Sequence, residues 1–223
     1  MSNDIRIALY GAGYLGRQIY HHLHAYYGDR ATVAGFIDDT KPVGEAVIDG
    51  LATLGSLAEA RNDPEQNPNA ISIVFAIGYT SMRARGRALQ RVLDAGYDLF
   101  DVIHPAAMIE PGASAGPGSV VLAGAVLDQG VTLGPGCFID IGVRLGAETR
   151  AGANNYFSSG TSTGSRVAIG DDCFFGMDCT ITTDVSLGSN LFVNAKTLVP
   201  RDVGDDLKLV ELHKSKQLPQ PDS

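Results

Sequence analysis

The sequence has little of what many small proteins depend on. It has no Trp and only three Cys in 223 residues, and none of the cysteines forms a CxxC pair. Neither a disulfide framework nor a zinc site is therefore indicated, and no metal is expected. The longest apolar run, residues 120–127, is far shorter than the eighteen or more residues that a membrane-spanning helix needs.

Positive charge is also scarce. Seventeen basic residues stand against twenty-five acidic ones, for a net charge of −8, which argues against a nucleic-acid-binding surface. Charged residues near the N-terminus interrupt the apolar stretch that a signal peptide requires. We therefore expect a cytoplasmic protein without nucleic-acid or membrane partners.

The first hundred residues alternate between strand-like and helix-like patterns. Short apolar runs at residues 5–10, 32–38 and 71–77 predict strands, and three- and four-residue spacing at 15–27 and 81–95 predicts helices. Residues 62–69 are polar and read as a loop. Strand, helix and strand in succession predict a small parallel sheet of Rossmann-like type, in a domain spanning residues 1–100.

The second half repeats every six residues. From Ile103 to Val199, seventeen consecutive hexads run without an insertion, and most begin with an aliphatic or aromatic residue. A six-residue period predicts a parallel β-helix, here over residues 101–203 with a tail at 204–223. Glycine often follows the first residue of a hexad, and we expect it to supply the backbone angles of the corners. All three cysteines occupy the fifth place, which predicts buried small side chains.

A glycine-rich motif follows the first predicted strand. Gly11, Gly13 and Gly16 form a GxGxxG sequence that opens the first predicted helix, and Asp38 closes the second strand. This pattern favours a phosphate-bearing nucleotide ligand. The alternative is a tight strand-to-helix turn without a ligand.

The order of these segments resembles the sialic acid O-acetyltransferase and bacillosamine N-acetyltransferase family of hexapeptide-repeat sugar acyltransferases. The matching segments are residues 11–16, 35–39, 76–78 and 103–105, followed by the hexads. The resemblance covers about residues 5–203 and implies a left-handed β-helix, a homotrimer, acetyl-CoA or another acyl-CoA bound at a subunit boundary, and a nucleotide sugar in the first domain. It places Asp39 and Gly78 beside the glycines and Asp38 in substrate binding.

The family transfers an acyl group from a thioester to a sugar amine or hydroxyl, with a His as general base. In register, this sequence has Ala147 at the base position and Tyr156 where a second family His often lies. The resemblance implies that Gly164 and Ser165 present an amide to the thioester carbonyl, and it places Tyr156 with them at the coenzyme. Without the His, the family's usual mechanism does not carry over.

Two carboxylates are candidates to replace the missing base. Asp140 stands where the family has an Asn near the acceptor, and Glu148 follows the vacant position. Either can act as base if burial raises its pKa, whereas both can also be ordinary turn residues. We expect His21, His22 and His24 on the exposed face of the first helix, a structural His104, and His213 in the tail.

Four arginines on the second long helix, at positions 83, 85, 87 and 91, form either a phosphate patch or, as we expect, a solvated face.

Three functions remain open. The first is acyl-CoA-dependent transfer to a nucleotide-linked amino- or hydroxy-sugar with a weakened or non-histidine site. The second is a non-catalytic or repurposed trimer that binds a nucleotide sugar. The third is a transferase with another donor or acceptor.

Overall fold

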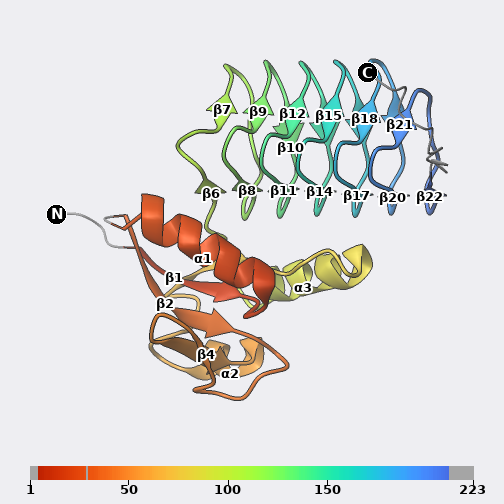
Figure 1. The fold of residues 1–223 in the computed structure, drawn as a ribbon. Coiled ribbons are helices and arrows are strands. Elements are labelled where there is room, and N and C mark those ends of the chain that lie inside the picture. The colour runs from red at the N-terminus through yellow and green to blue at the C-terminus, as the bar shows by residue number, and fades with distance from the viewer. Residues whose placement is uncertain (1–4, 29, 211–223) are drawn as a thin grey trace, which may run out of the picture.

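The computed structural model describes residues 5–28 and 30–210 and has two parts (Figure 1). The first part is a small sheet with helices on both of its faces. The second part is a long prism built from stacked coils of very short strands. The two parts lie against each other along one side of the prism.

The first part contains a five-stranded sheet of order β3-β4-β2-β1-β5. Neighbouring strands are parallel except for the β3–β4 pair, which is antiparallel. The interior strand β1 is mostly apolar and its last four residues are buried, as expected for a strand covered on both faces. The strands are β1 (Ile5–Tyr10), β2 (Ala31–Ile37), β3 (Ala46–Ile48), β4 (Leu51–Gly55) and β5 (Ser72–Phe75).

Three helices accompany this sheet: α1 (Tyr14–Tyr26), α2 (Leu57–Asn62) and α3 (Met82–Asp94). The sequence predicted α1, α3 and three of the strands within one or two residues at most ends. It missed the β3–β4 hairpin and α2, although α2 begins with a capping box between Ser56 and Glu59 that the sequence S-L-A-E displays. The loop predicted at residues 62–69 is present and begins where α2 ends, at Asn62.

The prism consists of three parallel sheets whose strands pair with residues eighteen positions away, so that one coil comprises three hexads. The strands are β6 (Val102–Ile103), β7 (Met108–Ile109), β8 (Val120–Val121), β9 (Val126–Leu127), β10 (Thr132–Leu133), β11 (Phe138–Ile139), β12 (Arg144–Leu145), β13 (Arg150–Ala151), β14 (Tyr156–Phe157), β15 (Ser162–Thr163), β16 (Ala168–Ile169), β17 (Phe174–Phe175), β18 (Thr180–Ile181), β19 (Ser186–Leu187), β20 (Phe192–Val193), β21 (Leu198–Val199) and β22 (Lys208–Leu209). The prediction of a parallel β-helix is confirmed.

The first residues of the hexads form the core of the prism. Val121, Ile139 and Phe175 are fully buried there, together with all three cysteines, which confirms the small-residue interpretation of the fifth place. Burial raises the pKa of the Cys137 thiol to about 11, so this thiol is protonated and unreactive near neutral pH.

The expected role of the glycines at the corners was wrong in one respect. The positive-φ residues lie three positions after the first residue of a hexad, as at Gly142 and Glu148, and not directly after it. Directly after it, the glycines serve close packing instead. A Cβ on Gly146 would lie 2.5 Å from the carbonyl oxygen of Gly164 in the next coil.

The prism continues beyond the boundary predicted at residue 203. Val203 bridges to Leu187, and β22 pairs with β20, so residues up to 209 add to the stack. The remainder of the predicted tail, with His213, lies outside the described residues.

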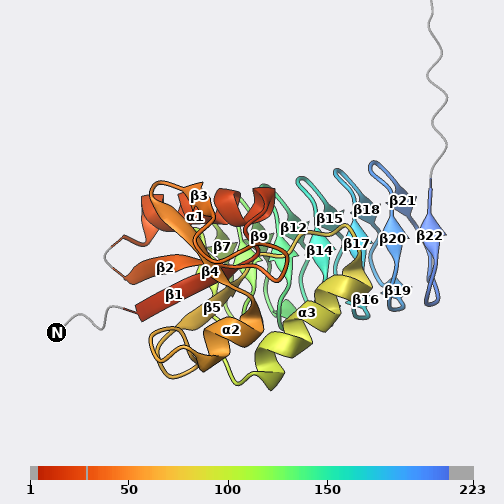
Figure 2. The ribbon, with the colours of Figure 1, turned by 90° about the horizontal axis from the view of Figure 1, so that it is seen from below.

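A buried arginine joins the two parts. Arg85 on α3 is 1% exposed, and its guanidinium donates to the carbonyl oxygens of Ile77 and Gly136, each at 2.8 Å, and to the side chain of Asn154. Burial lowers its pKa to about 10. The expectation that the α3 arginines form a solvated face was therefore wrong for Arg85. In both views α3 lies alongside the prism (Figures 1 and 2).

Candidate functional site

The carboxyl ends of β1, β2 and β5 meet at one edge of the first sheet, where each strand is followed by residues of the predicted site. The strand order reverses here, since β2 is added on one side of β1 and β5 on the other, while all three strands stay parallel. Parallel α/β sheets bind ligands in the crevice at such a switch point. Gly11, Asp38 and Gly78 come together at this edge.

Two of the three motif glycines are required by packing. A Cβ on Gly11, whose φ is +120°, would lie 2.6 Å from the carbonyl oxygen of Ala76, and one on Gly16 would collide with the carbonyl oxygen of Gly11. Gly13 is different, because a Cβ there would meet nothing within 4 Å. Gly13 is also the N-cap of α1, and no side chain caps this helix end. Gly13, Tyr14 and Leu15 at this helix end line an open cavity, and helix termini without a side-chain cap are sites at which phosphate binds.

Asp38 supports the glycine loop. Its carboxylate accepts hydrogen bonds from the amide of Ala12 at 3.0 Å and from the amide and hydroxyl of Thr40 at 2.9 and 2.6 Å. Burial alone would raise the pKa of Asp38, but the hydrogen bonds from Thr40 and Ala12 outweigh it, and the pKa is lowered. Asp38 is therefore ionised near neutral pH and fixes the conformation of the glycine loop.

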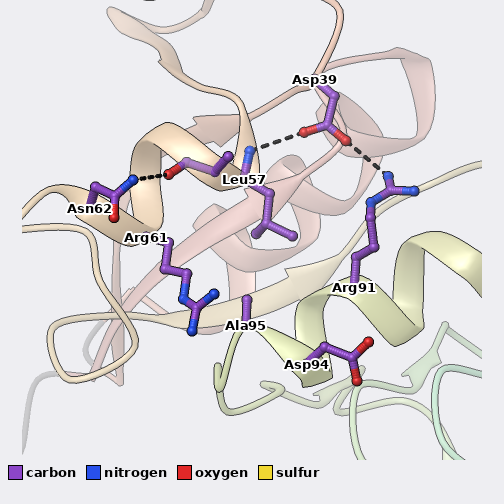
Figure 3. Close-up of a pocket in the computed structure, with 8 residues that line it drawn as sticks. Asp39, Leu57, Arg61, Asn62, Arg91, Asp94 and Ala95 are labelled. Atoms are coloured by element: carbon purple, nitrogen blue, oxygen red, sulfur yellow. Dashed lines mark hydrogen bonds and ion pairs between the residues drawn. The ribbon is translucent and has the colours of Figure 1, made fainter.

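Asp39 is held by three partners, two of which, Leu57 and Arg91, are drawn in Figure 3. It accepts hydrogen bonds from Tyr10 at 2.5 Å, from Arg91 at 2.9 Å and from the amide of Leu57 at 3.0 Å. Burial, together with the hydrogen bond to Asp39, raises the pKa of Tyr10 to about 12. A cavity of about 510 Å³ lies beside this network, between α2 and α3.

A cavity of about 680 Å³ lies between the edge of the first sheet and the prism. The first part supplies the N-terminal turn of α1, Asp38 and the segment after β5, and the prism supplies one corner and one strand. The lining residues are Gly11, Gly13, Tyr14, Leu15, Gln18, Asp38, Ala76, Ile77, Gly78, Tyr79, Thr80, Asp140, Ile141, Tyr156 and Ser159. Residues more than a hundred positions apart in the chain thus share one cavity.

Asp140 is the carboxylate that the prism presents to this cavity. It follows β11 at a corner of the prism and is half-buried. One oxygen accepts a hydrogen bond from the hydroxyl of Ser159 at 2.8 Å, and the other accepts a hydrogen bond from the amide of Ile141 at 2.8 Å. The side chain is thereby oriented, while carboxylate oxygens retain further lone pairs for a ligand.

Glu148 lies elsewhere, at the next corner of the prism, between β12 and β13. Its side chain is exposed and its φ is +60°, so it occupies a turn position that is glycine in other coils. Ala147 is beside it, and the amide of Arg166 in the following coil donates to the carbonyl of Ala147 at 2.8 Å. Gly164 and Ser165 precede Arg166 at this same corner. The structure therefore groups Glu148, Gly164 and Ser165 and separates them from Asp140.

Tyr156 is separated from Gly164 and Ser165 as well. It lies on β14, lines the cavity, and stacks on Phe138 with ring centroids 4.5 Å apart and near Tyr79 at 5.0 Å. Burial raises the pKa of its phenol, so the hydroxyl is protonated near neutral pH. Its position is beside the glycine loop rather than with the residues expected at the coenzyme.

The sequence reasoning missed Gln18, Tyr79 and Ser159, which line the cavity, and it misplaced His22. His22 is half-buried rather than part of an exposed face, and its ring lies 5.6 Å from that of His104. The four-residue spacing from Gln18 to His22 is the signal that could have placed both on one face of α1.

Residues 5–28 and 30–210 contain no group of three or more His, Cys, Asp or Glu residues placed to hold a metal ion. None of the described helices combines the length and apolar character needed to cross a bilayer.

Comparisons with known proteins point in one direction. No protein-family model and no curated protein matches the sequence. Among solved structures, the acetyltransferase domain of PglB from Neisseria gonorrhoeae is 24% identical with a TM-score of 0.81, covering 92% of this chain and 96% of its own. A mutant of perosamine N-acetyltransferase from Caulobacter crescentus, in complex with CoA and GDP-perosamine, is 25% identical with a TM-score of 0.80 and 91% coverage of both chains.

A third structure, WeeI from Acinetobacter baumannii, is 16% identical with a TM-score of 0.76 and covers 92% of this chain and 95% of its own. The first of these structures is an acetyltransferase domain, and the second is a sugar N-acetyltransferase. These likenesses span the glycine loop, the junction and the prism alike. The chain therefore has the fold of the hexapeptide-repeat sugar acetyltransferases, the family that its motifs resemble.

Proposed function

We propose that this protein transfers an acyl group from acyl-CoA to a nucleotide-linked amino sugar. The observation that carries the proposal is the cavity that joins an uncapped helix N-terminus to a prism-borne carboxylate. The first feature suits the diphosphate of a nucleotide sugar, because backbone amides and the helix dipole favour negative charge. The second suits an amine, which arrives as an ammonium ion.

The solved neighbours support this assignment. The perosamine N-acetyltransferase complex contains CoA and GDP-perosamine, and another PglB structure contains acetyl coenzyme A. We assign residues 1–100 to a Rossmann-like unit that binds the nucleotide, and the prism to a left-handed β-helix. Gly13 and Gly78, which both leave open space, would approach the ligand, while Gly11, Gly16, Asp38 and Asp39 shape the loops around it.

Of the two carboxylates, we assign the role of base to Asp140. It lines the cavity, whereas Glu148 is an exposed turn residue at another corner. Proton removal by a positioned carboxylate makes the amine nucleophilic as it attacks the thioester carbonyl. Backbone amides near Gly164 and Ser165 would stabilise the oxyanion.

The corner that holds Glu148, Gly164 and Ser165 does not line the cavity, and we propose that a second copy of the chain, in a homotrimer, brings its own such corner there. Met108, Met177 and Leu198 on the prism are more than half exposed, and packing of parallel prisms would cover such side chains. Sedimentation should show a trimer at micromolar concentration. A monomer would exclude a donor site shared between subunits.

The test of ligand binding uses Gly13, where the structure leaves room for a side chain without disturbing the fold. Calorimetry with GDP-perosamine and a panel of other nucleotide sugars should show binding that Gly13→Val abolishes. Gly204→Val is the matched control, because Gly204 is exposed and has equally open surroundings. Equal binding by Gly13→Val and the wild type would favour a tight turn without a ligand.

A non-catalytic trimer that binds a nucleotide sugar is the second candidate, and the observation that favours it is Ala147 in place of the family's base. The two candidates differ in turnover. Acetyl-CoA consumption with a bound nucleotide sugar supports the transferase, whereas tight binding with no turnover from any acyl donor supports the binding protein.

A further inference from the structure

The helix that opens at the glycine loop carries a histidine next to the cavity. Gln18 of α1 lines the cavity together with Asp140. His22 lies one helical turn further along the same face of α1, since residues four apart lie above one another. Its side chain is half-buried, unlike the exposed His21 and His24.

His104 fixes the environment of His22. The two rings meet edge to face with centroids 5.6 Å apart, and Tyr26 packs on His104 at 4.2 Å. The Nδ1 atom of His104 accepts the amide of Ala106 at 3.0 Å, so a neutral His104 carries its proton on Nε2. His104 is thus held by the backbone, and His22 packs against a ring of fixed orientation.

His104 and Asp140 lie on the same edge of the prism. They are separated by thirty-six residues, which is two coils, with Leu122 between them. Hydrogen bonds from His104 to Val121 and from Leu122 to Ile139, at 2.8 and 2.9 Å, link these coils. Two coils span about 10 Å along the prism. A side chain packed over this edge therefore lies within electrostatic reach of Asp140.

The groups that face His22 act on its charge in opposite directions. Burial and the neighbouring His104 lower its pKa, Asp140 raises it, and His21 on the same helix lowers it further. Tyr26 contributes a ring without charge. The net effect is a pKa below the usual 6.5, so that the imidazole is neutral at neutral pH.

We propose that His22 is a positioning residue for Asp140. The neutral imidazole of His22 leaves the Asp140 carboxylate free to receive the acceptor amine, and protonation of that imidazole withdraws the carboxylate from the amine. This inference rests on the proposed acyl transfer. It gives His22 on α1 an influence on the proposed base, in a protein that has Ala147 at the position of the family's histidine.

The reaction sets the requirement. The amine nitrogen forms a bond to the thioester carbon, the carbon–sulfur bond breaks, and its electron pair leaves with sulfur. An acceptor that arrives as an ammonium ion first releases one proton to solvent. The proton that the amine loses on attack passes to Asp140 and then to the CoA thiolate. An imidazolium at position 22 would stabilise the ionised carboxylate and lower its basicity, and it would also repel an incoming ammonium. Activity should then fall as pH decreases through the pKa of His22.

The first measurement is the pH profile of kcat/KM from pH 5 to 9, with GDP-perosamine and acetyl-CoA as substrates. Wild type should show an acid limb that His22→Gln moves to lower pH. The ratio of kcat/KM at pH 5 to kcat/KM at pH 8 should be about fivefold larger for His22→Gln than for wild type. His24→Gln is the matched control on the same helix and should reproduce the wild-type profile.

The second measurement does not depend on turnover. NMR titration of the imidazole of His22 should give a pKa about half a unit lower in Asp140→Asn, because the carboxylate that favours the imidazolium is gone. An unchanged titration would overturn the proposal. So would an acid limb that is identical in wild type and His22→Gln, and in that case turnover still supports the proposed transferase. Absence of turnover in wild type contradicts the transferase itself and, with it, this role of His22.

Discussion

Two corners of the prism carry the residues considered for chemistry, and they differ in what lies over them. The corner after β11 holds Asp140, half-buried and hydrogen-bonded to Ser159, with the first part of the chain forming the rest of the cavity. The corner after β12 holds Ala147 and Glu148, and Glu148 is exposed in a left-handed turn.

Both corners arise from the same six-residue repeat. Their difference shows that the repeat provides equivalent turn positions, whereas neighbouring elements decide which of them becomes part of a site. In a trimer the second corner would gain a neighbour of its own, which is where we place the donor. Four predictions test how far the two corners differ, beginning with the largest expected effect.

Asp140→Asn should lower kcat by about a hundredfold, since a positioned general base contributes about 10²–10⁴. Glu148→Gln should stay within about twofold of wild type, because Glu148 is exposed at the other corner. Steady-state kinetics with acetyl-CoA and the best nucleotide-sugar acceptor measure both. A larger loss in Glu148→Gln would exchange the roles of the two corners.

Gly146→Ala should destabilise the protein by about 1–3 kcal/mol, the usual cost of overpacking. The added methyl group would meet the carbonyl group of Gly164 in the adjacent coil, and a backbone group cannot move aside as a side chain can. Urea unfolding should show a lower midpoint, while Gly204→Ala, in open space, serves as the control. Equal midpoints would mean that the coils can separate at this corner.

Ala147→His should partly restore turnover to Asp140→Asn, by about tenfold, if the second corner approaches the acceptor in the assembled protein. The restored activity should depend on neutral imidazole and therefore rise with pH. Kinetics of the double variant against Asp140→Asn alone provide the comparison. No gain, with trimers intact, would place the acceptor out of reach of this corner.

The smallest expected effect concerns the turns themselves. Gly142→Ala should cost about 1 kcal/mol from backbone strain alone, because its φ is +68° and a Cβ would meet nothing within 4 Å. Glu148→Gly, at φ +60°, should change stability by less than about 1 kcal/mol, as relief of strain is offset by the entropy of glycine. Chemical denaturation of both variants checks the pair.

Much of the fold could be predicted because its signals are local and periodic. The hexad spacing fixes which side chains enter the prism, and the buried cysteines follow from their place in it. The sequence also separated the two long helices and three strands of the first part. The β3–β4 hairpin was missed because its strands are short and only partly buried.

The site was predictable only in pieces. The motif Gly11-x-Gly13 and Asp38 were found because strand ends and helix starts carry local signatures. The grouping of Asp140 with Gln18, and its separation from Glu148, depends on how the first part lies on the prism, and no spacing along the chain encodes that arrangement.

The sequence by itself determined the six-residue repeat and the glycine loop, because each follows from local neighbours, and it indicated the parallel sheet through the alternation of strand and helix patterns. The tertiary structure alone decided that Arg85 is buried, that Asp39 is held by Tyr10 and Arg91, and that His22 lies beside His104. The physical reason is that burial and charge at these side chains are set by contacts between segments 30 to 80 residues apart. The contacts of Asp39 form within the first part of the chain, whereas those of Arg85 and His22 form only when α3 and α1 pack against the prism.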